Sequence, residues 1–191
     1  MKFKTPNFQV IGLTACVLYS LFLAEQTFAA QECNITLSES NVDFGQVMRP
    51  GSNDPASGQP MFPLGNRVVS LNASCPTPAK LMVRLQGAGQ GEQFRFAQRG
   101  QMGVTLSNAS LDGRSVELAK VQSTGSAPGT SGSSIEATPG DRVIPISGGL
   151  PVVGSQLSMQ VEFKPLVPMT ELRTRDAKTL ESNLSFQISS H

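Results

Sequence analysis

Two cysteines, Cys33 and Cys75, constrain the fold of this chain more than any other feature of its sequence. Apolar residues alternate with polar ones after Cys33, and the same alternation leads up to Cys75. Because every second side chain of a β-strand points to the same face, each cysteine is expected to point where the hydrophobic residues point. The pattern predicts two neighbouring strands that are tied together across a core by a Cys33–Cys75 disulfide.

The N-terminus has the features of a secretory signal peptide. Two lysines precede an apolar run over residues 10–24, which is too short and too early for a membrane span. A small-x-small site predicts cleavage after Ala29, with cleavage after Ala30 as the less favoured alternative. Residues 1–29 are therefore expected to be removed, and residues 30–191 are expected to form a single domain.

One alternative at the N-terminus concerns Cys16. The stretch Leu13–Cys16 has the pattern of a bacterial lipoprotein site, in which Cys16 would carry the lipid. The apolar run continues past Cys16, which favours cleavage near Ala29 instead. The exported chain then keeps Cys33 and Cys75, and an even pair in an oxidising compartment favours a disulfide over a metal site or a catalytic nucleophile.

Composition argues against several classes of function. Without the signal, basic and acidic residues are balanced, so charge predicts neither a nucleic-acid partner nor an anionic membrane surface. There is no tryptophan, and the one tyrosine, Tyr19, lies in the signal, which disfavours sugar binding by aromatic stacking. The only histidine, His191, is the last residue, where an exposed and frayed tail is expected. No catalytic triad, phosphate-binding loop, dinucleotide fingerprint or metal-ligating motif occurs, so the sequence predicts neither an enzyme nor a cofactor.

The remainder of the chain is predicted to form short strands separated by turns, without a helical stripe of convincing length. The first strand is expected in two pieces between Cys33 and Val47, with a break near Ser38–Ser40. Arg49–Asn66 and Ser123–Gly140 are rich in turn-forming or small polar residues and are expected to be loops. The other expected strands are Arg67–Cys75, Lys80–Gln86, Gln93–Ala97, Gly103–Ser107, Ser115–Val121, Val143–Ile146, Gln156–Lys164 and Thr179–Ser189. This pattern predicts an all-β, immunoglobulin-like β-sandwich.

A motif between the cysteines carries a resemblance to a known family. The stretch Val42-Asp43-Phe44-Gly45-Gln46-Val47 is similar to the V-x-[LF]-G-x-V of pilins, and it follows a cysteine that opens a strand. A second cysteine closes the next strand, and the C-terminal strand alternates. In these features the sequence resembles the pilus (fimbrial) subunits of Gram-negative bacteria that are assembled by the chaperone–usher route. The likeness covers nearly all of residues 30–191 in outline and Cys33–Cys75 in detail.

The resemblance implies a sandwich that lacks its last strand and so has an open hydrophobic groove. A periplasmic pilus chaperone would fill this groove with one of its strands, and at the outer-membrane usher the N-terminal extension of another fimbrial subunit would replace it. The groove would be lined by Ile35, Leu37, Val42 and Phe44 on one side and by Leu184, Phe186 and Ile188 on the other. The resemblance further implies transit through the periplasm to a fimbrium at the cell surface, where an adhesive subunit would meet a host or surface receptor.

Two departures from the family pattern bear on this expectation. Many pilins have a tyrosine next to last, which is used in chaperone docking, and this chain ends Ile188-Ser189-Ser190-His191. Cleavage after Ala29 also leaves only Ala30–Glu32 before the first cysteine, which is too short for a donor strand. The sequence therefore suggests a subunit that accepts a strand but donates none, at the end of a fibre. The alternative is a self-contained secreted or surface β-sandwich, spore-coat-like or a lipoprotein, with a complete fold.

Overall fold

The computed structural model describes residues 32–48, 61–173 and 176–191 of the chain. Within this part, Glu32–His191 form one compact unit. The predicted signal peptide, Cys16 and most of the expected loop at Arg49–Asn66 lie outside the described residues.

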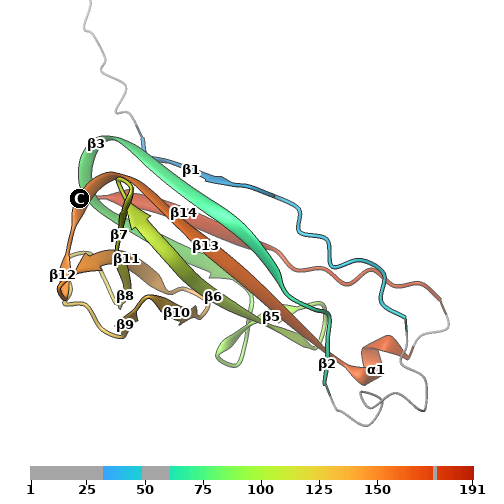
Figure 1. Ribbon diagram of the computed structural model, residues 1–191. Coiled ribbons are helices and arrows are strands. Elements are labelled where there is room, and N and C mark those ends of the chain that lie inside the picture. The colour runs from blue at the N-terminus through green and yellow to red at the C-terminus, as the bar shows by residue number, and fades with distance from the viewer. Residues whose placement is uncertain (1–31, 49–60, 174–175) are drawn as a thin grey trace, which may run out of the picture. The chain divides into compact units, whose positions relative to one another are not determined.

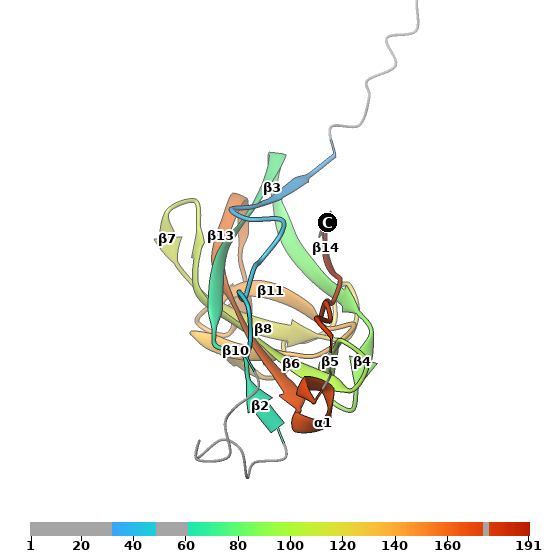
Figure 2. The same ribbon diagram turned by 90° about the vertical axis from the view of Figure 1, so that its right-hand side faces the viewer.

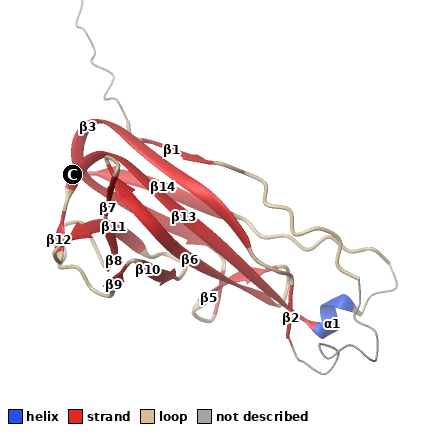
Figure 3. Ribbon diagram, in the orientation of Figure 1, coloured by secondary structure: helices blue, strands red, loops and turns tan. Residues whose placement is uncertain are grey.

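Nearly all regular structure in the described residues is β-strand, as Figure 3 shows in red. The strands are β1 (Asn34–Leu37), β2 (Met61–Pro63), β3 (Arg67–Gly87), β4 (Gly89–Gln90), β5 (Gln93–Phe96), β6 (Gly100–Leu111), β7 (Arg114–Ser115), β8 (Glu117–Val121), β9 (Ser131–Gly132), β10 (Ser134–Ala137), β11 (Arg142–Ser147), β12 (Leu150–Pro151), β13 (Val153–Pro168) and β14 (Leu184–Ser190). One short helix, α1 (Met169–Leu172), follows β13 directly.

The strands form two antiparallel layers that share β3 (Figure 1). The first sheet has the order β1-β3-β13-β6-β5-β4 and uses the N-terminal half of β3. The second sheet has the order β14-β3-β11-β8-β9 and uses the C-terminal half of β3. Figure 2 views the layers from the side, with β13 in the first sheet and β14 in the second. The predicted all-β sandwich is confirmed.

The core lies between the two sheets and is built from alternating residues of their strands. On β3, Leu71 faces inward from the first sheet and Leu85 from the second, and both have no exposed surface. Phe94 of β5 is equally buried and is the largest fully enclosed side chain. This alternation places the polar partners of each strand on the outer faces, which is the hydrophobic-in, polar-out pattern of a two-layer fold.

β3 crosses from one sheet to the other through a bulge, where the sequence predicted that two strands would be separated by Pro76–Pro78. The register of β13 on β3 runs from Gly154 opposite Ala79 directly to Gln156 opposite Ser74. The prolines fall in the skipped stretch, where their missing N–H groups remove no ladder bond. The predicted end of the strand was wrong because β13 supplies partners on both sides of the prolines.

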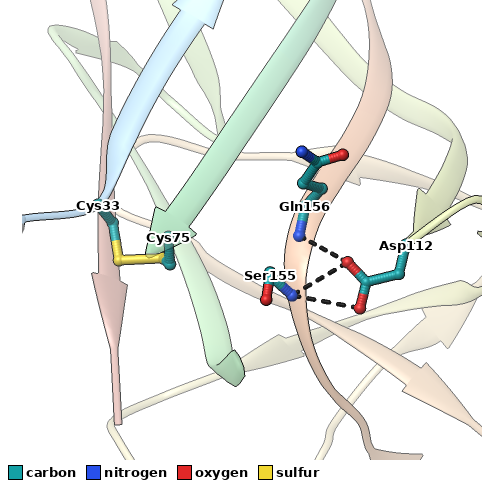
Figure 4. Close-up of a disulfide and its surroundings, with 5 residues drawn as sticks. All are labelled: Cys33, Cys75, Asp112, Ser155 and Gln156. Carbon is teal, nitrogen blue, oxygen red and sulfur yellow. Dashed lines mark hydrogen bonds between the residues drawn. A yellow bond between two sulfur atoms is a disulfide. The ribbon is translucent and has the colours of Figure 1, made fainter. Parts of the chain in front are cut away.

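The carboxylate of Asp112 holds the strand opposite this bulge (Figure 4). Asp112 Oδ1 accepts the backbone N–H groups of Ser155 at 3.1 Å and Gln156 at 2.8 Å. Asp112 lies in the turn between β6 and β7 with φ 48°, a left-handed conformation that aspartate tolerates. Next to it, a Cβ at Gly154 would lie 2.5 Å from Leu111 Cγ, so this close approach requires glycine.

Asp112→Ala should lower the free energy of unfolding by about 1–3 kcal/mol, because two backbone N–H groups lose their acceptor. Asp112→Asn keeps one side-chain oxygen and the tolerance for positive φ, so it should lose less than half as much. Urea unfolding of the two variants beside the wild type measures both values. An equal loss in Asn and Ala would mean that charge, and not the acceptor oxygen, is what stabilises the bulge.

Further sequence expectations were wrong. The described end of the expected loop Arg49–Asn66 contains β2, which pairs with β13. Ser123–Gly140 contains β9 and β10, because Ile135 and Ala137 are buried even though the segment is otherwise polar. The residues between the expected strands Gln156–Lys164 and Thr179–Ser189 were expected in no strand, but they continue β13 to Pro168 and then form α1. The second piece of the first strand is not a strand: residues 38–48 carry no strand assignment.

Candidate functional site

The open edges of β1 and β14 form the candidate site. Among the described residues, each of these strands pairs with β3 and with no other strand. Their Cα atoms nevertheless approach within 8 Å of each other, and one of the two strands lies in each sheet. The first sheet and the second sheet therefore both end at this border.

The hydrogen-bond pattern shows which backbone groups of β14 face the open edge. His191 exchanges both backbone hydrogen bonds with Lys80, at 3.1 and 3.3 Å. Hydrogen-bonded and non-bonded pairs alternate in an antiparallel ladder, and the register from Ser190 back to Leu184 has no shift. The N–H and C=O groups of Leu184, Phe186, Ile188 and Ser190 therefore point away from β3, toward β1.

β1 has the same arrangement. Ser38 donates its N–H to the C=O of Ser70 at 2.8 Å, in the register that pairs Leu37 with Leu71. By the same alternation, Ile35 and Leu37 direct their backbone groups away from β3. Five of these residues with outward-facing backbone groups also pack their side chains on the core: Ile35, Leu37, Leu184, Phe186 and Ile188.

All the residues predicted to line a groove lie against the core cluster, and all are half-buried. They are Ile35, Leu37, Val42, Phe44, Leu184, Phe186 and Ile188. Their cross-strand partners are more deeply enclosed, since Leu71 opposite Leu37 and Leu85 opposite Phe186 have no exposed surface. β1 and β14 therefore leave part of their apolar side-chain surface exposed to solvent, whereas their partners Leu71 and Leu85 on β3 do not.

Val42 and Phe44 reach this position from an extended segment and not from a strand. Phe44 packs edge-on against Phe96, with ring centroids 6.1 Å apart, and Arg67 lies over its ring at 5.9 Å. Arg67 Nε also donates to the C=O of Asp43 at 3.0 Å. The carboxylate of Asp43 accepts the N–H of Gly45, whose φ is +78°, so a local turn ends the extended run.

The predicted disulfide is present and closes one end of the border (Figure 4). Cys33 precedes β1 and Cys75 lies in β3 just before its bulge, with an S–S distance of 2.03 Å and a sequence separation of 42. The bond fixes the start of β1 to the point where β3 leaves the first sheet. This prediction is confirmed.

The segment before β14 closes the other end. Glu181 accepts the N–H of Ala97 through its C=O at 3.0 Å, and Ser182 Oγ donates to the C=O of Arg95 at 2.6 Å. Leu180, which sequence reasoning did not assign to the site, packs on the same core cluster. The predicted strand from Thr179 thus begins as a contact with the end of β5 and becomes β14 only at Leu184.

Other site types have little support in the described part of the chain. It contains no group of three or more His, Cys, Asp or Glu side chains arranged to hold a metal ion. None of its helices has the length and apolar character to span a membrane. His191 is exposed as predicted, but the expectation of a frayed end was wrong because its backbone continues the β14–β3 ladder to the last residue.

Comparison with known proteins adds one similarity. No protein-family model matches the chain. The chain is 26% identical over 158 residues to the uncharacterized protein YhcE of Escherichia coli (strain K12), which covers 80% of this chain and 84% of that protein. That name states no activity, so the function of this chain is argued from its own border of β1 and β14.

Proposed function

We propose that this protein is a structural or adhesive subunit of a surface fimbria that is completed by a strand from another protein. The observation that carries the proposal is the pair of open edges at β1 and β14, whose inward side chains remain half-buried. A strand added at this border would pair with the outward-facing backbone groups of an edge and cover this apolar area. A periplasmic chaperone would supply the strand first, and a neighbouring subunit would supply it at the usher.

The composition of the two edges supports strand addition. Soluble β-proteins protect their edges with charges, prolines, bulges or covering loops. β14 has the sequence LSFQISS and β1 has NITL, so neither strand carries a charge or a proline. Exposed, uncharged, alternating edge strands are unfavourable for a secreted monomer but suit a site that accepts another chain.

The proposal also assigns a place and a route. A subunit with a signal peptide would be exported to the periplasm and end on the fimbrium. If the mature chain begins at Ala30, it has no strand to donate, which fits a subunit at the end of a fibre. A mass spectrum of the exported protein locates its N-terminus, and a start near Val17 would contradict the terminal position.

The test is to express the mature chain in the periplasm and purify it with and without a twelve-residue peptide of alternating apolar and polar residues. The peptide should raise the yield of soluble monomer in size-exclusion chromatography and the midpoint of thermal unfolding, because it buries the apolar border. A peptide of the same composition with its apolar residues grouped together is the control. A stable monomer that ignores both peptides would identify the self-contained secreted sandwich instead.

A matched pair of variants tests whether the peptide adds as a strand. Ile188→Ala and Ile188→Pro both remove most of the side chain, but only proline removes the N–H that faces the open edge. Peptide binding should be weaker in Ile188→Pro than in Ile188→Ala, by about fivefold or more for one lost hydrogen bond. Equal binding would mean that the peptide lies on the protein without pairing to β14.

A further inference from the structure

A small cavity lies on the outer face of the second sheet and has a volume of about 110 Å³. Met82 of β3 and Ile144 of β11 line it, and both belong to an apolar cluster that is separate from the main core. Their neighbours in sequence, Leu81 and Val143, belong to the main core, so Met82 and Ile144 point to the opposite face of the sheet. Val121 of β8 packs on the same cluster and also lines the cavity.

Two segments beside the sheet also line the cavity, and hydrogen bonds hold both of them. Ser123 and Ser126 belong to a turn in which Ser126 Oγ donates to the C=O of Ser123 at 2.7 Å. Pro151 and Val152 line the cavity as well, and Val152 donates its N–H to the C=O of Pro145 at 3.2 Å. These bonds hold the walls in place without a ligand, so binding would not have to order them.

The basic residues that line the cavity are Lys80 and His191. They exchange both backbone hydrogen bonds, at 3.1 and 3.3 Å, and are therefore directly opposite each other. Side chains that are directly opposite in an antiparallel pair lie on the same face, and Lys80 shares that face with Met82, two positions along β3. Both basic side chains and the apolar cluster thus belong to one face of the second sheet.

The charge of this site is not balanced by acidic side chains. None of the described residues that line the cavity is acidic. The ion pairs in the described part of the chain use Lys120, Lys164 and Lys178, and Lys80 takes part in none of them. Lys80 and His191 are exposed, so a ligand can reach them from solvent. Accessible donors next to an apolar cavity favour a ligand with an anionic head and an apolar tail.

We propose that this cavity binds a short-chain aliphatic carboxylate, with its carboxylate at Lys80 and His191 and its chain against Met82 and Ile144. An ammonium group donates charge-assisted hydrogen bonds to a carboxylate, and an imidazole donates an N–H in either protonation state. A cavity of about 150 Å³ holds the six carbons of benzene, so one of about 110 Å³ suits a chain of about four carbons. Pentanoate carries such a chain.

The probe for this site is pentanoate, titrated into the purified mature protein at constant ionic strength and followed by NMR. Acetate keeps the charge and lacks three carbons, so it should bind at least tenfold more weakly because less apolar surface is buried. Pentylammonium has a similar chain with the opposite charge and should not bind detectably. Equal binding of pentanoate and either control compound, or resonance shifts confined to residues away from the cavity, would overturn the proposal.

Variants of the two basic residues test the carboxylate position. Lys80→Gln and His191→Gln should each weaken pentanoate binding by about fivefold or more. Lys80→Arg keeps a cationic donor and should bind within about twofold of the wild type. Arg114→Gln removes the same charge from β7 in the other sheet and should bind like the wild type. Unchanged binding in Lys80→Gln, whose side chain is exposed and not needed for the core, would overturn the assignment.

A cavity-filling variant tests the position of the chain. Val121→Phe adds volume at a residue that lines the cavity, so pentanoate should then bind no more tightly than acetate. Acetate binding should stay within about twofold of the wild type, because Lys80 and His191 are unchanged. Pentanoate binding at wild-type strength in folded Val121→Phe would show that the chain lies outside the cavity and would overturn the proposal.

Discussion

Cys33→Ser should lower the free energy of unfolding by about 4 kcal/mol, because the disulfide closes a loop with a sequence separation of 42 and restricts the unfolded chain accordingly. Domains of this size are stable by about 5–15 kcal/mol, so the loss removes a large share of the total. The bond also ties the start of β1 to β3, and β1 has no other strand partner in the described part of the chain. The periplasmic yield of the variant should therefore fall sharply.

Denaturant unfolding of the oxidised wild type, the reduced wild type and the double variant Cys33→Ser/Cys75→Ser measures this effect. The reduced protein and the double variant should agree, because both lack the cross-link and neither leaves a single reactive thiol. Normal yield and unchanged stability in the double variant would contradict the contribution assigned to the bond.

Leu71→Ala should destabilise the isolated protein by about 2–5 kcal/mol, and Leu37→Ala by about 1 kcal/mol or less. The two leucines are direct partners across β3 and β1, but only Leu71 is fully enclosed. When a donor peptide covers the border, the cost of Leu37→Ala should rise toward that of Leu71→Ala. The difference arises because the added strand would bury the surface that Leu37 now exposes.

Thermal and urea unfolding of each variant, with and without the alternating peptide, gives the four values. Ser74→Ala on the outer face of β3 is the control and should change stability by no more than about 0.5 kcal/mol. Equal losses at Leu37 and Leu71 in the absence of peptide would show that Leu37 is already enclosed. The border would then have no room for another strand, and the proposed function would fail with it.

The alternation of apolar residues predicted the inward faces of the border strands well. Ile35 and Leu37 follow Cys33 at every second position, and Phe186 and Ile188 do the same near the C-terminus. Because side chains alternate between the two faces of a strand, these apolar residues can be buried together only if their shared face points to the core. The direction of each side chain therefore follows from the local sequence. The position of the disulfide follows from the same period.

Long-range pairing decided the features that the sequence did not reveal. Pro76 and Pro78 are local stop signals, yet β3 continues because β13 pairs on both sides of them. Ile135 and Ala137 are too few to form a visible pattern, and β10 forms because β6 offers it an edge. Phe44 does not continue a strand and instead packs on Phe96 of β5. The sequence around Phe44 does not indicate that β5 lies beside it. In each case a partner far along the chain overrode the local preference.

The outer face of the second sheet shows the same limit. The period of two is enough to place Arg84 on an outer face, between the buried Val83 and Leu85. Nothing in either strand alone indicates that Arg142 stands directly opposite, because that depends on the register of two segments far apart in sequence. Cross-strand pairs of this kind become visible only when the register is known.

The sharing of β3 by both sheets has a mechanical consequence. In a sandwich with separate sheets, one layer can shear over the other while each stays whole. Here the same strand is bonded to β13 in one layer and to β11 and β14 in the other. A pull on the C-terminus is carried along β14 into β3 and from there into β13. A pulling force on the C-terminus therefore acts on both layers at once, and the two layers are expected to resist it and to unfold together.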